Sequence, residues 1–187
     1  GISPTGAIFW TSTSGAPNPH PRTPFCPLVS STTAPSPTVL SAPGHDTFIQ
    51  LNAMSASGVL IGFGISADVG SANALVWTST ASQASVLAEP STAAFAIPVA
   101  ISSTGRIIGV QYTASGTSDV VLSPITWATS GATPTTMHLP TGYTGGVAIG
   151  YLASGEIVGD GFDALGDAHV LVWSSSSATP TVLPDVS

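Results

Sequence analysis

A tryptophan that ends an apolar run and precedes small polar residues recurs along this chain, and this repetition limits the fold more than any other feature. The residues of this pattern are Trp10, Trp77, Trp127 and Trp173. Self-similarity at a period of about 20–50 residues is typical of repeat architectures, in which each copy forms one supersecondary unit. We therefore expect a series of similar copies, with the tryptophans packed in the core between them rather than serving as sugar-stacking platforms.

Glycines and a closing apolar run accompany the tryptophans. Gly58, Gly105 and Gly155 stand at corresponding places before the last three tryptophan strands, and a second glycine follows each of them. The first glycine predicts a tight turn with positive φ. The second is expected to end the next strand or to form a bulge in it. After the tryptophan, the copy closes on an apolar residue, as in Ser36–Leu40 and Thr179–Leu183.

Each complete copy offers four short β-rich runs separated by Gly, Pro and Ser, which is the pattern of antiparallel hairpins. In the third copy these runs are expected at roughly 97–102, 106–113, 120–128 and 134–139. Four strands in about 40–50 residues is the layout of a propeller blade. The predicted fold class is all-β, with repeated four-stranded antiparallel units, β-propeller-like, in a single repeat domain over 1–187. The units are expected at about 44–90, 91–140 and 141–187, after an incomplete first unit at about 1–43 with an insert at 16–33.

The order of these signals resembles the HAF-type extracellular repeats. The shared pattern is Ala-Ile-x-x-x-Gly-x-Ile-x-Gly, then a strand that ends in Trp, then a closing Leu. Ala168–Trp173 is the segment most similar to the His-Ala-Phe stretch of that family. The resemblance implies copies laid out like propeller blades, and it implies no particular activity.

The scarcity of charge excludes several classes of partner. Charged residues make up 6% of the chain, there is no lysine, and the arginines are Arg22 and Arg106. With a net charge of −7, no basic patch exists to displace counterions from nucleic-acid phosphates or to bind an anionic membrane. No apolar run approaches the roughly 20 residues that span a bilayer.

Richness in Ser and Thr together with the absence of Lys predicts an extracellular or cell-surface protein. Gly1–Pro4 lacks the basic and apolar regions of a signal peptide, so we expect the chain to begin after a removed leader. Ser30–Thr38 is similar in composition to an O-glycosylated segment. The lone Cys26 is expected to be a small apolar residue, with an intermolecular disulfide as the alternative.

The motifs of common enzyme classes are missing from the sequence. It contains no Gly-x-Ser-x-Gly elbow and no phosphate-binding loop with its lysine. His20, His45, His138 and His169 lack the spacing of metal ligands, and the His45-Asp46 pair is interpreted as a solvated turn. We therefore expect a non-enzymatic protein without a catalytic residue or a bound cofactor.

One acidic loop is a candidate metal site. Asp160, Asp163 and Asp167 fall in a single glycine-containing hairpin loop, and calcium prefers several oxygen ligands from a flexible loop. The spacing differs from that of an EF-hand, and the corresponding loops of other copies keep only Asp68 and Asp119. A solvated turn is therefore the alternative that the pattern favours.

The incomplete first copy carries the functional hypothesis. Three and a half units in a ring would leave exposed strand edges, which template association unless charges such as lysine protect them. We therefore expect a structural protein whose copies form a homo-oligomer or filament by strand addition across edges. A closed monomer, in which 16–50 completes the half unit, and a piece of a longer array are the alternatives. The second functional hypothesis is a lectin-like propeller that binds glycans, which predicts polar or aromatic loop residues in every copy.

Overall fold

The computed structural model shows an all-β protein. The residues that it describes are 8–12, 26–30, 38–43, 46–66, 72–78, 83–91, 95–115 and 119–184. Within these ranges every regular element is a strand and all strand pairs in the sheets are antiparallel. The described residues include no helix long and apolar enough to cross a membrane. The chain divides into an N-terminal unit, Gly1–Leu87, and a C-terminal unit, Ala88–Ser187.

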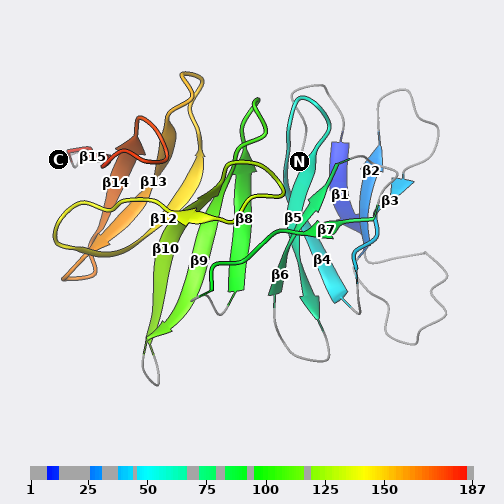
Figure 1. The fold of residues 1–187 in the computed structure, drawn as a ribbon, viewed down its shortest axis with the longest axis horizontal. Coiled ribbons are helices and arrows are strands. Elements are labelled where there is room, and N and C mark those ends of the chain that lie inside the picture. The colour runs from blue at the N-terminus through cyan, green and yellow to red at the C-terminus, as the bar shows by residue number, and fades with distance from the viewer. Residues whose placement is uncertain are drawn as a thin grey trace. The chain divides into compact units, whose positions relative to one another are not determined.

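The N-terminal unit contains two sheets (Figure 1). The strands of the first sheet are β1 (Ile8–Ser12), β2 (Cys26–Ser30) and β3 (Thr38–Val39). The strands of the second sheet are β4 (Asp46–Met54), β5 (Leu60–Ser66), β6 (Ala72–Trp77) and β7 (Ser85–Val86). In both sheets the spatial order of the strands follows the chain, which is what successive hairpins produce.

The first sheet differs from the sequence-based expectation. The sequence predicts two strands and an insert at 16–33, but Cys26–Ser30 within this insert forms β2, which pairs with β1 and with β3. The first copy therefore has at least three strands. Because β2 pairs with the short closing strand, β2 rather than β1 occupies the place of the tryptophan strand.

The register places Trp10 on a different strand of its copy from the other tryptophans. Leu28 of β2 pairs with Val39 as Leu75 of β6 pairs with Val86. The recurring pattern predicts that Trp10 ends the third strand of its copy, as the other tryptophans do, but it lies on β1, in the place of the second strand, so this prediction is wrong. Both strands are short apolar runs, and a tryptophan alone does not distinguish them.

The C-terminal unit contains two four-stranded sheets in simple order (Figure 1). The strands of its first sheet are β8 (Phe95–Ile101), β9 (Ile107–Ser115), β10 (Asp119–Trp127) and β11 (Thr135–Thr136). The strands of its second sheet are β12 (Tyr143–Tyr151), β13 (Ile157–Asp163), β14 (Ala168–Trp173) and β15 (Thr181–Val182). The prediction of an all-β chain with repeated four-stranded antiparallel sheets is confirmed.

The first glycine of each copy turns the hairpin between the first two strands. Gly58, Gly105 and Gly155 have φ of 86°, 84° and 91°, the left-handed region that glycine enters without a steric penalty. In the second of these turns the Ser102 N–H donates to the Arg106 carbonyl at 2.8 Å, and the Ser102 hydroxyl accepts the Arg106 N–H at 3.0 Å. The hydroxyl thus satisfies a backbone donor that the turn would leave open.

The second glycine lies inside a strand and faces a bulge on its neighbour. The bulges interrupt β4, β8 and β12, the first strand of each sheet. Opposite them, a Cβ on Gly62, Gly109 or Gly159 would lie 2.0–2.2 Å from a backbone carbonyl oxygen of the bulged strand. The glycine therefore neither ends nor bulges its own strand; it leaves room for the displaced backbone of the next one.

Candidate functional site

Three buried tryptophans make the same hydrogen bond. Trp77, Trp127 and Trp173 are each 0% exposed. Their indole N–H groups donate to the backbone carbonyls of Ser41 (2.8 Å), Ala88 (2.7 Å) and His138 (2.7 Å). Each acceptor is the second residue after a closing strand. Burial of a tryptophan requires a partner for its N–H, and this carbonyl supplies one at the same place each time.

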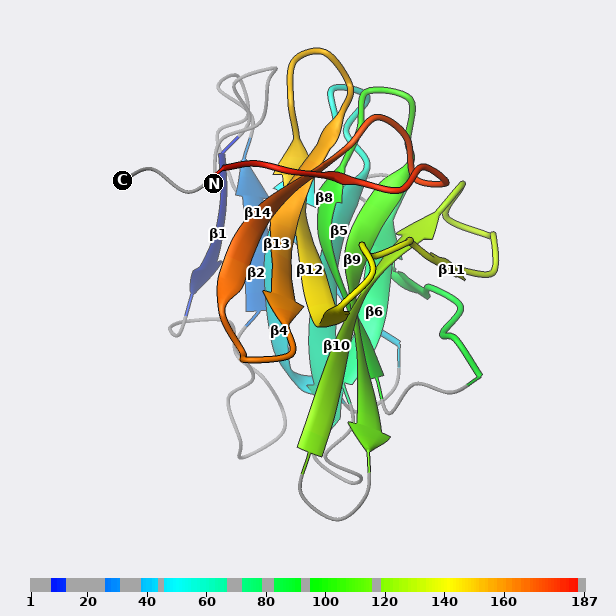
Figure 2. The same cartoon turned by 90° about the vertical axis from the view of Figure 1, so that its left-hand side faces the viewer.

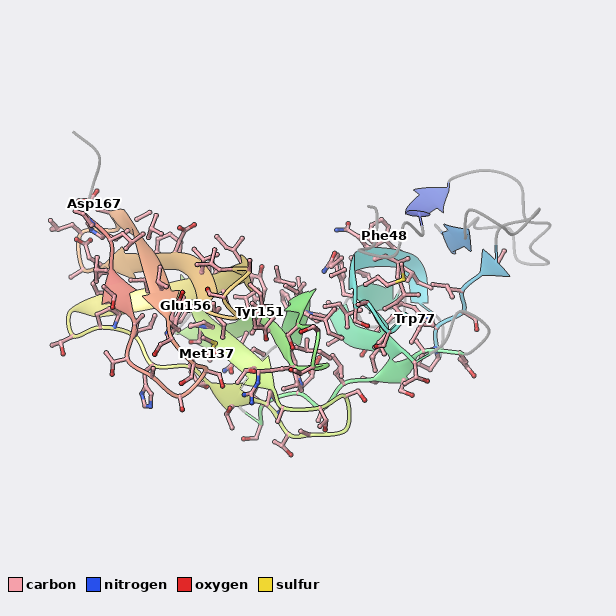
Figure 3. All side chains as sticks on the ribbon, turned by 90° about the horizontal axis from the view of Figure 1, so that it is seen from above. Phe48, Trp77, Met137, Tyr151, Glu156 and Asp167 are labelled. Carbon is pink, nitrogen blue, oxygen red and sulfur yellow. The ribbon has the colours of Figure 1, made fainter. Side chains whose placement is uncertain are left out.

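The tryptophan bond joins two sheets in the C-terminal unit. Trp173 of β14 packs in one apolar cluster with Ile108 and Met137 of the preceding sheet, and Ala148, Ile157 and Leu171 belong to the same cluster. Figure 3 labels Met137 and Tyr151 where the two sheets meet. We call this contact between β8–β11 and β12–β15 the tryptophan joint.

The N-terminal unit has an equivalent cluster. Trp77 packs with Leu40, which directly follows β3, and with apolar side chains of the second sheet. Leu40 and Met137 occupy the same closing position of their copies and are 1% and 2% exposed. The same kind of contact therefore links one sheet to the next in both units. The side chain of Trp10 lies outside the described residues.

A polar group borders the tryptophan joint. The Tyr151 hydroxyl donates to the Arg106 carbonyl at 3.2 Å, and the Arg106 guanidinium donates to the Ser176 hydroxyl at 2.6 Å. Burial raises the pKa of Tyr151 to about 12, although Arg106 and a hydrogen bond with Ser102 oppose the shift. Sequence reasoning did not identify this arrangement, because it depends on which turns meet across two sheets.

The acidic loop forms a hairpin turn around Asp163. Its Oδ1 accepts the backbone N–H groups of Leu165 at 2.8 Å and Asp167 at 3.0 Å, and its Oδ2 lies 3.5 Å from His169 Nε2. Gly166 has a φ of 85°, so the loop repeats the glycine turn of the earlier hairpins with a carboxylate in place of the serine hydroxyl. Although partial desolvation acts in the opposite direction, these two N–H groups and His169 lower the pKa of Asp163.

The three predicted calcium ligands have different positions. Asp160 lies within β13, where it pairs with Val147 and Val170, whereas Asp163 ends that strand. Figure 3 shows Asp167 at the outer tip of the hairpin, away from Met137 and Tyr151. No group of three or more His, Cys, Asp or Glu side chains among the described residues could hold a metal ion. Asp163 contacts the backbone of its own turn and His169.

Within the described ranges, the remaining histidine and acidic side chains do not form a common cluster. His169 lies edge-on to Tyr143 at 5.7 Å between ring centroids, His138 is exposed, and His20 and His45 lie outside those ranges. Glu89, which sequence reasoning missed, has a buried Oε1 without a hydrogen-bond partner. Burial raises the pKa of Glu89, and a hydrogen bond from the backbone of Ala96 opposes the shift.

No family model matches the chain, and no curated protein is significantly similar to it. The similarity to the HAF-type repeats therefore stays a prediction, based on the short motifs quoted above.

Proposed function

We propose that this protein is a non-enzymatic structural module, made of blade-like sheets, whose copies assemble into a larger extracellular structure. The observation that carries the proposal is the repeated bond from tryptophan to carbonyl. It occurs at Trp77, Trp127 and Trp173, and in each of the two units it links one sheet to the next. Repeat architectures of this kind grow by stacking, because each sheet buries one face on its neighbour.

The use of the polar side chains supports a structural role. Asp163 binds the backbone of its own turn, and Ser102 does the same in the hairpin before β9. Arg106 spans from one sheet to the other at the joint. Groups that a catalytic site would bring together are here used one by one to fix turns and contacts.

The extracellular location is part of the proposal and comes from composition. A chain with no lysine and with 6% charged residues has few charges to keep its copies apart, because charge repulsion and lysine-rich edges are what normally maintain monomers. Such a surface suits a protein that functions as an assembly.

Sedimentation velocity of the full chain over a wide concentration range tests this proposal, with electron microscopy of the same samples. We expect the mean mass to rise with concentration and ordered oligomers or polymers to be visible. A monodisperse monomer at every concentration would overturn the proposal. If that monomer also bound defined sugars on a glycan array, the lectin hypothesis would replace it.

A further inference from the structure

The two sheets of the C-terminal unit differ in how far the corresponding face of each is covered. On β8–β11, the face turned toward β12–β15 carries Ile108, Thr126 and Val110, which are 0%, 3% and 5% exposed. Ile108 packs in the tryptophan joint. This face, together with Met137 at the closing position, is the surface that receives the next sheet.

The last sheet presents a copy of this surface on its own outer side. Its register repeats that of the preceding sheet: Val158 pairs with Val172 as Ile108 pairs with Thr126. Val158 and Val172 are half-buried, while Leu183, at the closing position that Met137 holds in the preceding sheet, is 42% exposed. In Figure 2 this sheet faces the viewer, crossed by the chain that runs from β14 to β15. Within the C-terminal unit, Val158, Val172 and Leu183 thus repeat the positions of Ile108, Thr126 and Met137 on a face that no described sheet of that unit covers.

The backbone acceptor of the joint is repeated as well. Pro184 is the second residue after β15, as His138 is the second residue after β11. The His138 carbonyl accepts the indole N–H of Trp173. The three tryptophans whose side chains the structure describes all donate to other carbonyls.

The sheet edges are less suited to association than this face. The long outer strands β4, β8 and β12 each contain a bulge, and β8 also contains Pro98. Bulges twist an edge away from a potential partner, and proline withholds a donor, so both protect an edge without lysine. The contact between copies is therefore better made by the face than by strand addition.

We infer that the outer face of β12–β15 is a docking surface for the first sheet, β1–β3, of a second copy of this chain. The inference rests on the proposed function and names the contact that assembly would use. It continues an interface that the chain already builds internally. In that internal contact, β12 lies against β8, β9 and β10, and Leu171 and Trp173 of β14 belong to the same apolar cluster as Ile108.

The described strands of the first sheet have the pairing of the second, third and fourth strands of a complete copy. In it, β2 and β3 have the pairing that β14 and β15 have in the last sheet, with Leu28 opposite Val39 as Leu171 is opposite Val182. The backbone register also pairs β1 with β2, with Trp10 opposite Leu28. A head-to-tail contact of this kind joins two different surfaces, and it produces a ring or a filament according to the rotation between copies.

Asp160 sets a limit on the strength of this contact. It pairs with Val170 on β14, whereas Val110 pairs with Pro124 at the same place in β8–β11. Burial of a carboxylate costs free energy unless it is paired. The contact is therefore expected to be weaker than the internal joint, and removal of this charge should strengthen it.

The experiment compares self-association of the full native chain with that of four variants by sedimentation velocity. Val172→Asp and Leu183→Asp place a charge on the proposed surface, and we expect each to weaken association at least tenfold. Asp160→Val restores the residue of the covered sheet and should strengthen it severalfold. Val120→Asp is the matched control, because Val120 is 60% exposed and lies at the opposite end of β10 from Trp127; it should associate like the native chain. Circular dichroism checks that every variant keeps its β-sheet signal.

The outcomes separate the two proposals. If the native chain associates and folded Val172→Asp and Leu183→Asp associate as strongly as Val120→Asp, the docking surface is wrong while the proposed function stands. If Asp160→Val alone fails to strengthen association while the two aspartate variants weaken it, the surface is supported. If the native chain remains a monomer, the proposed function itself is overturned.

Discussion

The two sheets of the C-terminal unit have the same strand order and turns, but they differ in burial. One face of β8–β11 is covered by β12–β15, whereas the corresponding face of β12–β15 is not covered by another described sheet of this unit. Both have four antiparallel strands, a glycine turn between the first two strands, a bulge in the first strand and a glycine opposite that bulge. The corresponding closing residues nevertheless differ in exposure, 2% for Met137 and 42% for Leu183. The comparison shows that turns and bulges shape each sheet locally, whereas stacking of sheets decides which apolar residues become core.

The largest expected effect is at the joint itself. Trp173→Ala removes a fully buried side chain and should lower the free energy of unfolding of the C-terminal unit by about 3–5 kcal/mol, the range of such truncations. Val172→Ala, on the uncovered side of the same strand, should cost less than about 1.5 kcal/mol because the side chain is only half-buried. Chemical denaturation of both variants measures the difference. Equal losses would mean that the two faces of β14 do not differ as the structure shows.

A smaller loss of stability is expected on substitution of the glycine opposite the bulge, which both sheets share. Gly159→Ala and Gly109→Ala each bring a Cβ within 2.0–2.2 Å of a backbone carbonyl oxygen, so the bulged strand must move. We expect both to destabilise by about 1–3 kcal/mol, as overpacking does. Gly150→Ala is the matched control, because its Cβ meets nothing within 4 Å and its φ lies outside the left-handed region. A loss at Gly150 as large as that at Gly159 would contradict the steric explanation.

The sequence predicts those parts of the fold that depend on local chemistry. The turns at Gly58, Gly105 and Gly155 follow from glycine spacing alone, because only glycine enters positive φ cheaply. The strands β8 to β10 follow from their apolar runs. The bulges do not follow, because a bulge is a relation between two strands and the sequence shows only the glycine of one of them.

The first copy shows the limit of pattern matching most clearly. The strand Cys26–Ser30 is five residues long and contains a proline, which is why the pattern assigns it to an insert, and its pairing on both sides is what identifies it. The candidate site has the same limit. The acidic residues are visible in the sequence, but only the turn geometry shows that Asp163 binds backbone N–H groups.

The smallest expected effect concerns the ionisable turn of the last sheet, for which the turn at Ser102 provides the uncharged counterpart. The pKa of Asp163 is lowered from its ordinary value of 3.8, so the folded state favours the carboxylate. Its contribution to stability is therefore fully present above the unfolded pKa, and it is lost as the pH falls below about 4 through the folded pKa. Asp163→Ser keeps one acceptor for the turn, as in the hairpin of Ser102, and removes the charge.

We expect Asp163→Ser to be slightly less stable than the native chain at neutral pH and the two to converge as the pH falls toward about 2. Thermal unfolding at a series of pH values measures this convergence, and Asp160→Ser serves as a control that retains the Asp163 carboxylate. If Asp163→Ser lost stability with acid as steeply as the native chain, the carboxylate would not be the group that stabilises the turn. A stable Asp163→Ser turn at all pH values would instead show that one hydroxyl is enough to close a hairpin of this repeat, which is the inference that Ser55 and Ser102 already suggest from their own turns.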